Sequence, residues 1–228
     1  MHHNITLYTK LIGIAATIFC VQKTAIAKNL VEVDSIAGVI PPVTKSDRQQ
    51  LNPIAQNTLT KVDEYNRLAR RKYEQGDYQG ALADLNRALQ LEPNNVRARL
   101  GRGAMKVRVK DYQGALADFN RAIQLEPNSA KGYINRGGVR SLQFQGIQDN
   151  KGALADLNRA IQLDPSDADA YNNRSLLRYH NLKDRSGAIT DLQKVAQLLR
   201  QQGNRKEAQR VMGIVKQWQS ETKRTGTL

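Results

Sequence analysis

The same stretch of sequence occurs three times in this chain of 228 residues. It reads GALADLNRALQLEPNN at 80–95, GALADFNRAIQLEPNS at 114–129 and GALADLNRAIQLDPSD at 152–167. Self-similarity at a period of about 20 to 50 residues is the signature of repeat architectures. Each unit of such an array buries its apolar face only against its neighbours. The chain is therefore expected to form an array of similar units.

The copies follow a step close to 34 residues. Ala81, Ala115 and Ala153 are equivalent, which makes the first step 34 residues and the second 38. The four additional residues fall between the helices of the third unit, around FQGIQDN at 144–150. A longer loop costs little entropy, so this insertion is expected either to be neutral or to contribute to a binding face.

Each unit is expected to be a pair of helices. From Thr58 onward, apolar residues recur at three- and four-residue steps, which is the spacing of one helix face. Gly76 ends the first run, and Pro93 with two asparagines ends the second. The expected hairpins are 58–76 with 78–91, 96–109 with 112–125, 130–144 with 151–163, and 168–180 with 186–202.

Residue size supports close packing between these helices. Small residues stand where facing helices must approach, and large apolar residues stand beside them. The small set is Ala69, Gly103, Gly137 and Ser175 on first helices with Ala81, Ala115, Ala153 and Ala188 on second helices, and the large set is Leu85, Phe119, Leu157 and Leu192. The fold class is therefore all-α, with a core that continues from unit to unit.

A further helix is expected after the fourth unit. No proline closes this unit, so its second helix should continue to about Gln202 before Gly203 breaks it. Asn204 can then cap a final helix whose apolar residues are Ala208, Val211, Met212, Val215 and Trp218.

These features resemble the tetratricopeptide repeat (TPR) family over roughly residues 60–202. The resemblance rests on the 34-residue step, the small-residue positions, GDY at 76–78 and the closing prolines Pro93, Pro127 and Pro165. It implies an α-solenoid of four hairpins, about 62–95, 96–129, 130–167 and 168–202, followed by a capping helix and tail within 203–228. The sequence NRG at 135–137 and the segment QQGNRKEAQR resemble those in exported TPR proteins of photosynthetic bacteria.

The N-terminus resembles a secretory signal. A short basic start precedes the apolar run LIGIAATIFCV at 11–21, and AIA follows at 25–27, which predicts cleavage of residues 1–27. Export to the periplasm, the thylakoid lumen or the outside of the cell follows from this prediction. Cys20 would be lost with the signal, which leaves no thiol and no disulfide. Residues 28–57, with adjacent prolines in VIPPV, are expected to be a flexible tether, and the alternative is that VEVDSIAGVIPPV pairs as an extended strand or folds back into a groove.

The charge balance is strongly basic. The chain has 35 Lys and Arg against 21 Asp and Glu, a formal net charge of +14 and a pI near 10.0. Such an excess favours anionic partners. One unit holds much of it, because residues 95–110 contain no acid and six basic residues, namely Arg97, Arg99, Arg102, Lys106, Arg108 and Lys110. Arg99 and Lys106 occupy positions where the family often has large aromatic residues, so their alkyl stems are expected to cover the core while the charges reach water.

The sequence gives little basis for catalysis. A carboxylate recurs in every unit with a base three residues later, as Asp84 with Arg87, Asp118 with Arg121, Asp156 with Arg159, and Asp191 with Lys194. We expect these to be exposed pairs along helices, worth about 0.2 to 0.5 kcal/mol each. After cleavage His180 would be the only histidine, so neither a zinc site nor a catalytic triad can be assembled around it. A non-enzymatic protein without a cofactor is predicted.

The resemblance instead points to a binding surface, because first helices line the concave side of TPR arrays. The residues expected to line this groove are Asn66, Arg67, Arg70, Tyr73, Arg97, Leu100, Ala104, Arg108, Lys131, Ile134, Asn135, Asn172, Asn173 and Leu176. Asparagine and arginine would contact backbone and acidic groups, and Leu100, Ile134 and Leu176 would be apolar anchors.

The leading hypothesis is an exported scaffold that binds a protein or peptide of acidic character in a basic concave groove. The alternative is peripheral binding to an anionic membrane surface or an acidic cell-wall polymer. Nucleic acid is disfavoured by the exported address and by the lack of interleaved aromatics for stacking. The sequence does not define an oligomeric state.

Overall fold

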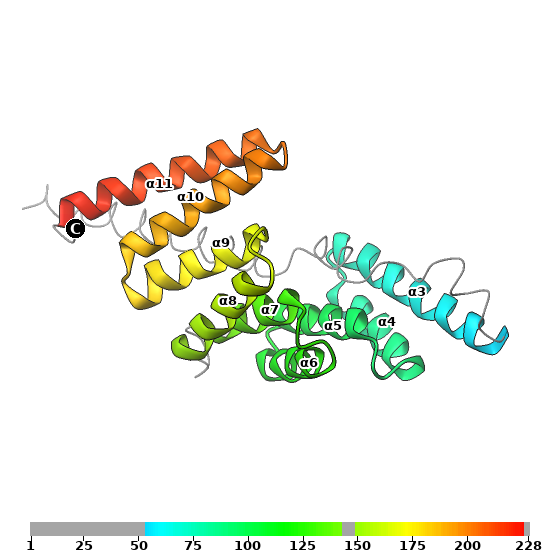
Figure 1. The fold of residues 1–228 in the computed structure, drawn as a ribbon. Coiled ribbons are helices and arrows are strands. Elements are labelled where there is room, and N and C mark those ends of the chain that lie inside the picture. Colours follow the sequence, from blue (N-terminus) through cyan, green and yellow to red (C-terminus); the bar gives the residue numbers. More distant parts are fainter. Residues whose placement is uncertain (1–52, 143–148, 226–228) are drawn as a thin grey trace, which may run out of the picture.

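The computed structural model describes residues 53–142 and 149–225, and every regular element in these ranges is a helix. The predicted signal peptide, most of the predicted tether and the centre of the insertion lie outside the described residues. Figure 1 shows the hairpins side by side from α3 at one end to α11 at the other. The helices are α3 Pro53–Glu74, α4 Tyr78–Leu91, α5 Val96–Arg108, α6 Tyr112–Leu125, α7 Ala130–Arg140, α8 Asn150–Leu163, α9 Ala168–Leu176, η2 Leu177–Leu182, α10 Arg185–Gln201 and α11 Arg205–Thr225.

The expected all-α hairpins are confirmed, with two differences at their ends. Helix α3 begins at Pro53, five residues before the predicted start, so 53–57 are helical instead of part of a tether. Proline is tolerated there because the first turn of a helix needs no backbone donor. Helix α7 ends at Arg140, short of the predicted residue 144.

The fourth repeat contains a π-helical turn that the sequence reasoning missed. Ala153 and Ala188 are 35 residues apart, one more than the usual step. The wider i→i+5 turn of η2 accommodates one additional residue within a continuing helix. It also places Asn181, whose Nδ2 donates to the Ser141 carbonyl at 2.7 Å and to Asn150 Oδ1 at 2.8 Å. This side chain therefore connects the fourth repeat to both sides of the insertion in the third.

Each second helix starts in the same way, with an aspartate cap and a glycine three residues later. Asp77 accepts a hydrogen bond from the Gly80 backbone N–H at 2.8 Å. A Cβ on Gly80 would lie 2.0 Å from the carboxylate, so this close approach requires glycine. The same pair recurs as Asp111 with Gly114, Asp149 with Gly152 and Asp184 with Gly187.

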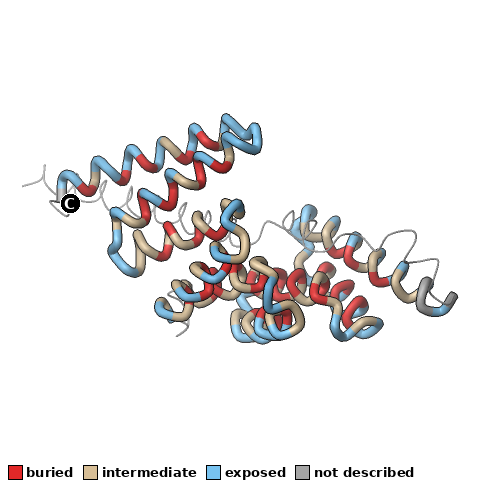
Figure 2. Tube along the Cα trace, viewed as in Figure 1, coloured by how far each residue is buried: buried red, intermediate tan, exposed pale blue. Residues whose placement is uncertain are grey.

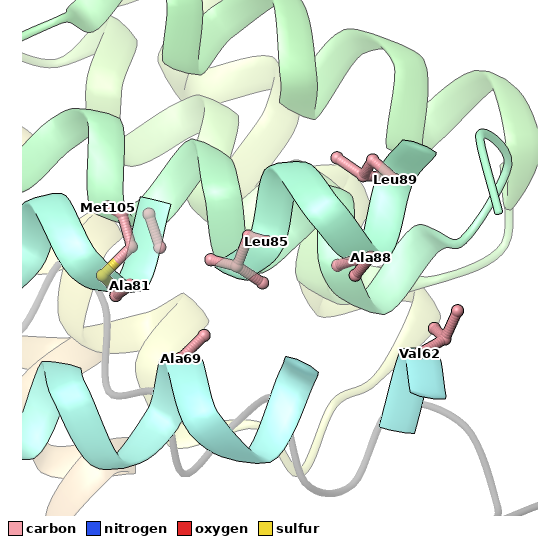
Figure 3. Packing of buried hydrophobic residues seen from close by; sticks show 9 residues of the cluster. Val62, Ala69, Ala81, Leu85, Ala88, Leu89 and Met105 are labelled. Atoms are coloured by element: carbon pink, nitrogen blue, oxygen red, sulfur yellow. The ribbon is translucent and has the colours of Figure 1, made fainter. Parts of the chain in front are cut away.

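The core lies between the two helices of each hairpin and continues into the next, as the buried stripes in Figure 2 show. Figure 3 shows Ala69 of α3 across from Ala81 and Leu85 of α4. In the second repeat, a Cβ on Gly103 would lie 2.5 Å from the Phe119 ring. The predicted small positions are therefore confirmed as the places of closest helix contact.

The array curves with the first helices on its inner side. Consecutive first helices touch one another, α3 with α5, α5 with α7 and α7 with α9, whereas contacts between consecutive second helices in the described ranges are weaker. Elements on the inside of a curved stack lie closer together than those outside. At the far end α11 packs along α10, and Gly203 between them has a φ of 80°, as the predicted break requires. Asn204 Oδ1 accepts from the Glu207 N–H at 3.4 Å, which confirms the predicted cap.

Candidate functional site

The repeated aspartates are buried, so the prediction of exposed pairs is wrong. Asp84, Asp118, Asp156 and Asp191 are 1%, 2%, 4% and 2% exposed. They lie beside the apolar stripe of each second helix and face the first helix of the same repeat. Of the four expected pairs along the helix, only Arg87 with Asp84, at 3.1 Å, is among the ion pairs of the described residues.

The partners of these aspartates form a ladder of three arginines, Arg102, Arg136 and Arg174. Arg136 donates from Nε and Nη2 to Asp156 at 2.9 and 2.6 Å, and from Nη1 to Asn120 of the preceding repeat at 2.7 Å. Arg102 binds Asp118 and Asn86 in the same way, and Arg174 binds Asp191 and Asn158. Each arginine therefore connects its own repeat to the one before it.

One turn after the position of the ladder arginines, each repeat has a cation that binds its buried aspartate, and the first repeat has this cation without a ladder arginine. These pairs are Lys72 with Asp84 at 2.6 Å, Lys106 with Asp118 at 2.8 Å, Arg140 with Asp156 at 2.9 Å and Arg178 with Asp191 at 2.8 Å. Much of the positive charge on the first helices is thus used inside the array and is not available to a partner.

Arg99 and Lys106 also depart from expectation. Their charged groups turn towards Asp118 and extend only partly into water, because the side chains are 15% and 22% exposed. The buried aspartate attracts them towards α6.

Three of the predicted groove residues belong to the core. Leu100 and Ile134 are 1% and 4% exposed and Ala104 is fully buried, so they cannot anchor a ligand. They belong to buried hydrophobic clusters that join neighbouring helices of the array. Leu176 is half-buried and packs against the core of the fourth repeat.

Other predicted groove residues are brought together. Arg108 of α5 donates to the Tyr73 hydroxyl of α3 at 2.8 Å, and its guanidinium lies 5.5 Å from the Tyr73 ring centre. Arg70 pairs with Glu74 at 3.2 Å and Lys131 with Asp167 at 3.0 Å, which lowers the positive charge along this side. Arg67 is exposed and Arg97 half-buried, and Arg97 is in none of the ion pairs of the described residues.

Two asparagines on this side hold buried amide groups without partners. Asn66 of α3 is 9% exposed and Asn173 of α9 is 6% exposed, and neither Nδ2 has a hydrogen-bond acceptor among the described residues. Asn135 of α7 and Asn172 of α9, which is adjacent to Asn173 in the sequence, are half-buried. A buried donor without a partner costs about 1 to 3 kcal/mol, so each amide is a position where a ligand acceptor would be stabilising.

An aromatic cluster joins the fourth repeat to α11. Tyr179 of η2 stacks on Trp218 with ring centres 3.8 Å apart, and His180 meets the same indole edge-on at 6.2 Å. The Tyr179 hydroxyl donates to Glu221. Burial, strengthened by this hydrogen bond, raises the pKa of Tyr179 to about 12. Burial also lowers the pKa of His180, and Lys183 adds to the effect.

The described residues contain no group of three or more His, Cys, Asp or Glu side chains placed to hold a metal ion. No helix in the same part of the chain is long and apolar enough to cross a lipid bilayer.

Comparison with known proteins identifies related repeats. A family model described as tetratricopeptide repeat matches residues 64–135, and one described as TPR repeat matches residues 147–181. No curated protein sequence matches the chain.

Several solved structures share the fold at low sequence identity. A thermophilic TPR protein of Thermus thermophilus, TTC0263, is 21% identical with a TM-score of 0.55 and covers 68% of this chain and 89% of its own. MamA from Desulfovibrio magneticus RS-1 is 21% identical with a TM-score of 0.50, over 71% of this chain and 96% of its own. An O-GlcNAc transferase of Thermobaculum terrenum is also 21% identical, with a TM-score of 0.55, but the 61% of this chain that aligns covers only 26% of that enzyme.

Proposed function

Because the chain is a tetratricopeptide repeat protein, and such arrays are interaction scaffolds, we propose that a partner binds along the inner side of its first helices. We call this surface the inner row and define it by the predicted groove residues that remain outside the core. They are Asn66, Arg67, Arg70, Tyr73, Arg97, Arg108, Lys131, Asn135, Asn172, Asn173 and Leu176.

The observation that carries the proposal is the pair of buried, unpartnered amides at the two ends of the inner row. Asn66 lies in the first repeat and Asn173 in the fourth. Backbone carbonyl groups of an extended peptide would accept hydrogen bonds from both. A ligand that spans the array would thereby satisfy donors that the free protein leaves without partners.

The partner is proposed to be acidic over the second repeat. Arg97 lies on the face of α5 opposite Asp118, away from the carboxylate that holds its neighbours. Arg108 of the same helix donates to the Tyr73 hydroxyl. Attraction between these guanidinium groups and a partner carboxylate should weaken as salt is added, because exposed charges are screened.

The proposal includes export. The apolar run at 11–21 and AIA at 25–27 support cleavage after Ala27, which would place the scaffold in the periplasm, the thylakoid lumen or outside the cell. N-terminal sequencing of the protein recovered from its host tests this part by itself. An N-terminus at Met1 would contradict it.

A peptide array of acidic and neutral sequences tests the inner row. The variant Asn173→Leu keeps the side-chain volume close to that of asparagine and removes the unsatisfied donor. It should leave the free protein at least as stable and weaken the selected peptide about tenfold, the effect of one lost hydrogen bond of about 1.4 kcal/mol. Arg97→Ala should also weaken binding, most strongly at low salt.

The matched control is Arg159→Ala, which removes an exposed arginine on a second helix. Its affinity should equal that of the original chain. Equal affinities for all three variants would exclude the inner row as the binding surface. Peptides that fail to bind while liposomes with anionic headgroups do bind would favour the alternative, peripheral attachment to an anionic membrane surface or acidic polymer.

A further inference from the structure

The second repeat has more positive charge around its buried aspartate than any other repeat. Arg99, Arg102 and Lys106 approach Asp118 at 3.6, 2.6 and 2.8 Å. Elsewhere in the described ranges each buried aspartate has two cations within ion-pair distance. One carboxylate therefore balances three cations here, and two positive charges are left over.

The surplus originates at position 99. The residues one repeat away from Arg99 are tyrosines, Tyr65, Tyr133 and Tyr171. The rings of Tyr133 and Tyr171 lie under arginines of the ladder, with 5.6 and 5.5 Å between guanidinium carbon and ring centre. In the second repeat the guanidinium of Arg99 takes the place of the ring, so this repeat has a positive charge where the other repeats have an aromatic ring.

Arg99 has no carboxylate of the described residues within hydrogen-bond distance. Its Nη1 lies 3.6 Å from Asp118, its Nη2 donates to the Pro93 carbonyl, and its buried Nε has no acceptor in the described part of the chain. The pKa of Arg99 is lowered, chiefly by burial, and the charges of Arg102 and Arg121 lower it further while Asp118 opposes them. An additional negative charge beside Arg99 would relieve this repulsion.

Arg121 of α6 reaches the same turn, and its hydrogen-bond acceptors among the described residues are neutral. Its Nη2 donates to Asn94 Oδ1 at 3.1 Å and its Nη1 to Gln124 Oε1 at 3.3 Å. Arg99 donates to Pro93 and Arg121 donates to Asn94, so two guanidinium groups bind consecutive residues of one turn. Arg121 is exposed and the Arg99 side chain is 15% exposed, so both can be reached from solvent.

We propose that Arg99 and Arg121 clamp a phosphate-type oxyanion at the Pro93–Asn94 turn, between α4 and α5. Guanidinium groups bind phosphate through two parallel N–H donors. A phosphate group carries a charge of about −1.5 to −2 near neutral pH, so it would compensate positive charge that Asp118 leaves unbalanced beside Arg99 and Arg121. This site is separate from the inner row, because α5 turns Arg99 towards α6 and Arg97 away from it.

Calorimetric titration of the purified protein with inorganic phosphate, at constant ionic strength set by chloride, tests the clamp. Binding by the original chain should be weakened at least about tenfold in Arg121→Gln, the loss expected for one charge-assisted contact. The matched control is Arg159→Gln. Arg159 lies in the same local sequence as Arg121, NRAIQL, but its own repeat has Tyr133 at the position of Arg99. This variant should therefore bind phosphate as tightly as the original chain.

Arg99→Tyr provides an independent variant that restores the residue of the other repeats. It should abolish phosphate binding and raise the melting temperature measured without phosphate, because the repulsion is removed. Arg121→Gln changes an exposed side chain and keeps the clamp testable if Arg99→Tyr does not fold. Phosphate affinity that is the same in the original chain, Arg121→Gln and Arg159→Gln would overturn the proposal.

Co-sedimentation with vesicles distinguishes the possible sources of the phosphate. One set of vesicles contains phosphatidic acid and the other contains only phosphatidylcholine. Co-sedimentation with phosphatidic acid that is lost in Arg121→Gln and kept in Arg159→Gln assigns the clamp to a lipid phosphate. Binding of inorganic phosphate without co-sedimentation assigns it to a free or small-molecule phosphate. Absence of both in the original chain refutes the clamp.

Discussion

Replacement of Asp156 by alanine separates the two interpretations of the repeated carboxylates. If Asp156 were half of an exposed pair with Arg159, its removal would cost at most about 0.5 kcal/mol. In the structure it is 4% exposed and accepts three hydrogen bonds, at 2.9 and 2.6 Å from Arg136 and at 2.9 Å from Arg140. Asp156→Ala leaves two guanidinium groups facing an empty, largely buried position.

Removal of one partner from a buried ion pair costs about 3 to 5 kcal/mol, because the remaining charge has lost its compensation. For an array of this size, 1 kcal/mol corresponds to roughly 2 to 4 °C in melting temperature. Asp156→Ala should therefore lower the melting temperature by about 6 to 20 °C. An exposed pair predicts a change of no more than about 2 °C.

Thermal unfolding followed by circular dichroism at 222 nm measures the difference, and Arg159→Ala is the control. Arg159 is exposed on the same helix, and its removal should change the melting temperature by no more than about 2 °C. If Asp156→Ala and Arg159→Ala melt within about 2 °C of each other, the ladder of arginines does not stabilise the array as argued.

Three further changes should have measurable effects. Gly103→Ala places a Cβ 2.5 Å from the Phe119 ring and should cost about 1 to 3 kcal/mol in urea unfolding, whereas Gly213→Ala, with no atom within 4 Å, should stabilise α11 by about 0.5 to 1 kcal/mol. Trp218→Ala removes a side chain that is 4% exposed and should cost about 3 to 5 kcal/mol in the same assay. Burial lowers the pKa of His180, so the unfolded chain binds a proton at this histidine more readily than the folded chain does. The free energy of unfolding should therefore fall as the pH drops below about 6.5. His180→Gln should remove that part of the pH dependence of urea unfolding.

The hairpins could be predicted from the sequence because each signal is local. The helical spacing of apolar residues, the breakers Gly76 and Pro93, and the recurring Ala81 position all act within one unit. The same reasoning failed for Asp84, which was assigned to an exposed face because it is charged. Its place three residues after Ala81 and four before Ala88, which are both fully buried, was the signal that it lies beside the core.

The binding surface was harder to predict because core and groove share one periodicity. On a first helix of an array, residues between consecutive first helices and residues facing a ligand can be adjacent, so spacing alone does not distinguish them. Leu100 and Ile134 belong to the buried core, while Asn66 and Asn173 have buried amide groups without an acceptor among the described residues. The π-helical turn could have been inferred, since the 35-residue step to Ala188 already requires one residue to be accommodated.

Helix α5 carries the two proposed sites on opposite sides, and this arrangement follows from helix geometry. At 3.6 residues per turn, positions two apart are separated by roughly 200°, so Arg97 and Arg99 cannot face the same ligand. Asp118 of α6 binds Arg102 and Lys106 and so determines which side of α5 faces α6. The effects of Arg97→Ala and Arg99→Tyr should therefore be separable, with peptide affinity changed by the first and phosphate affinity by the second. In the double variant each affinity should equal that of the corresponding single variant, because sites that share no partner behave additively, and a loss of both affinities in either single variant would mean that one ligand covers both faces of α5.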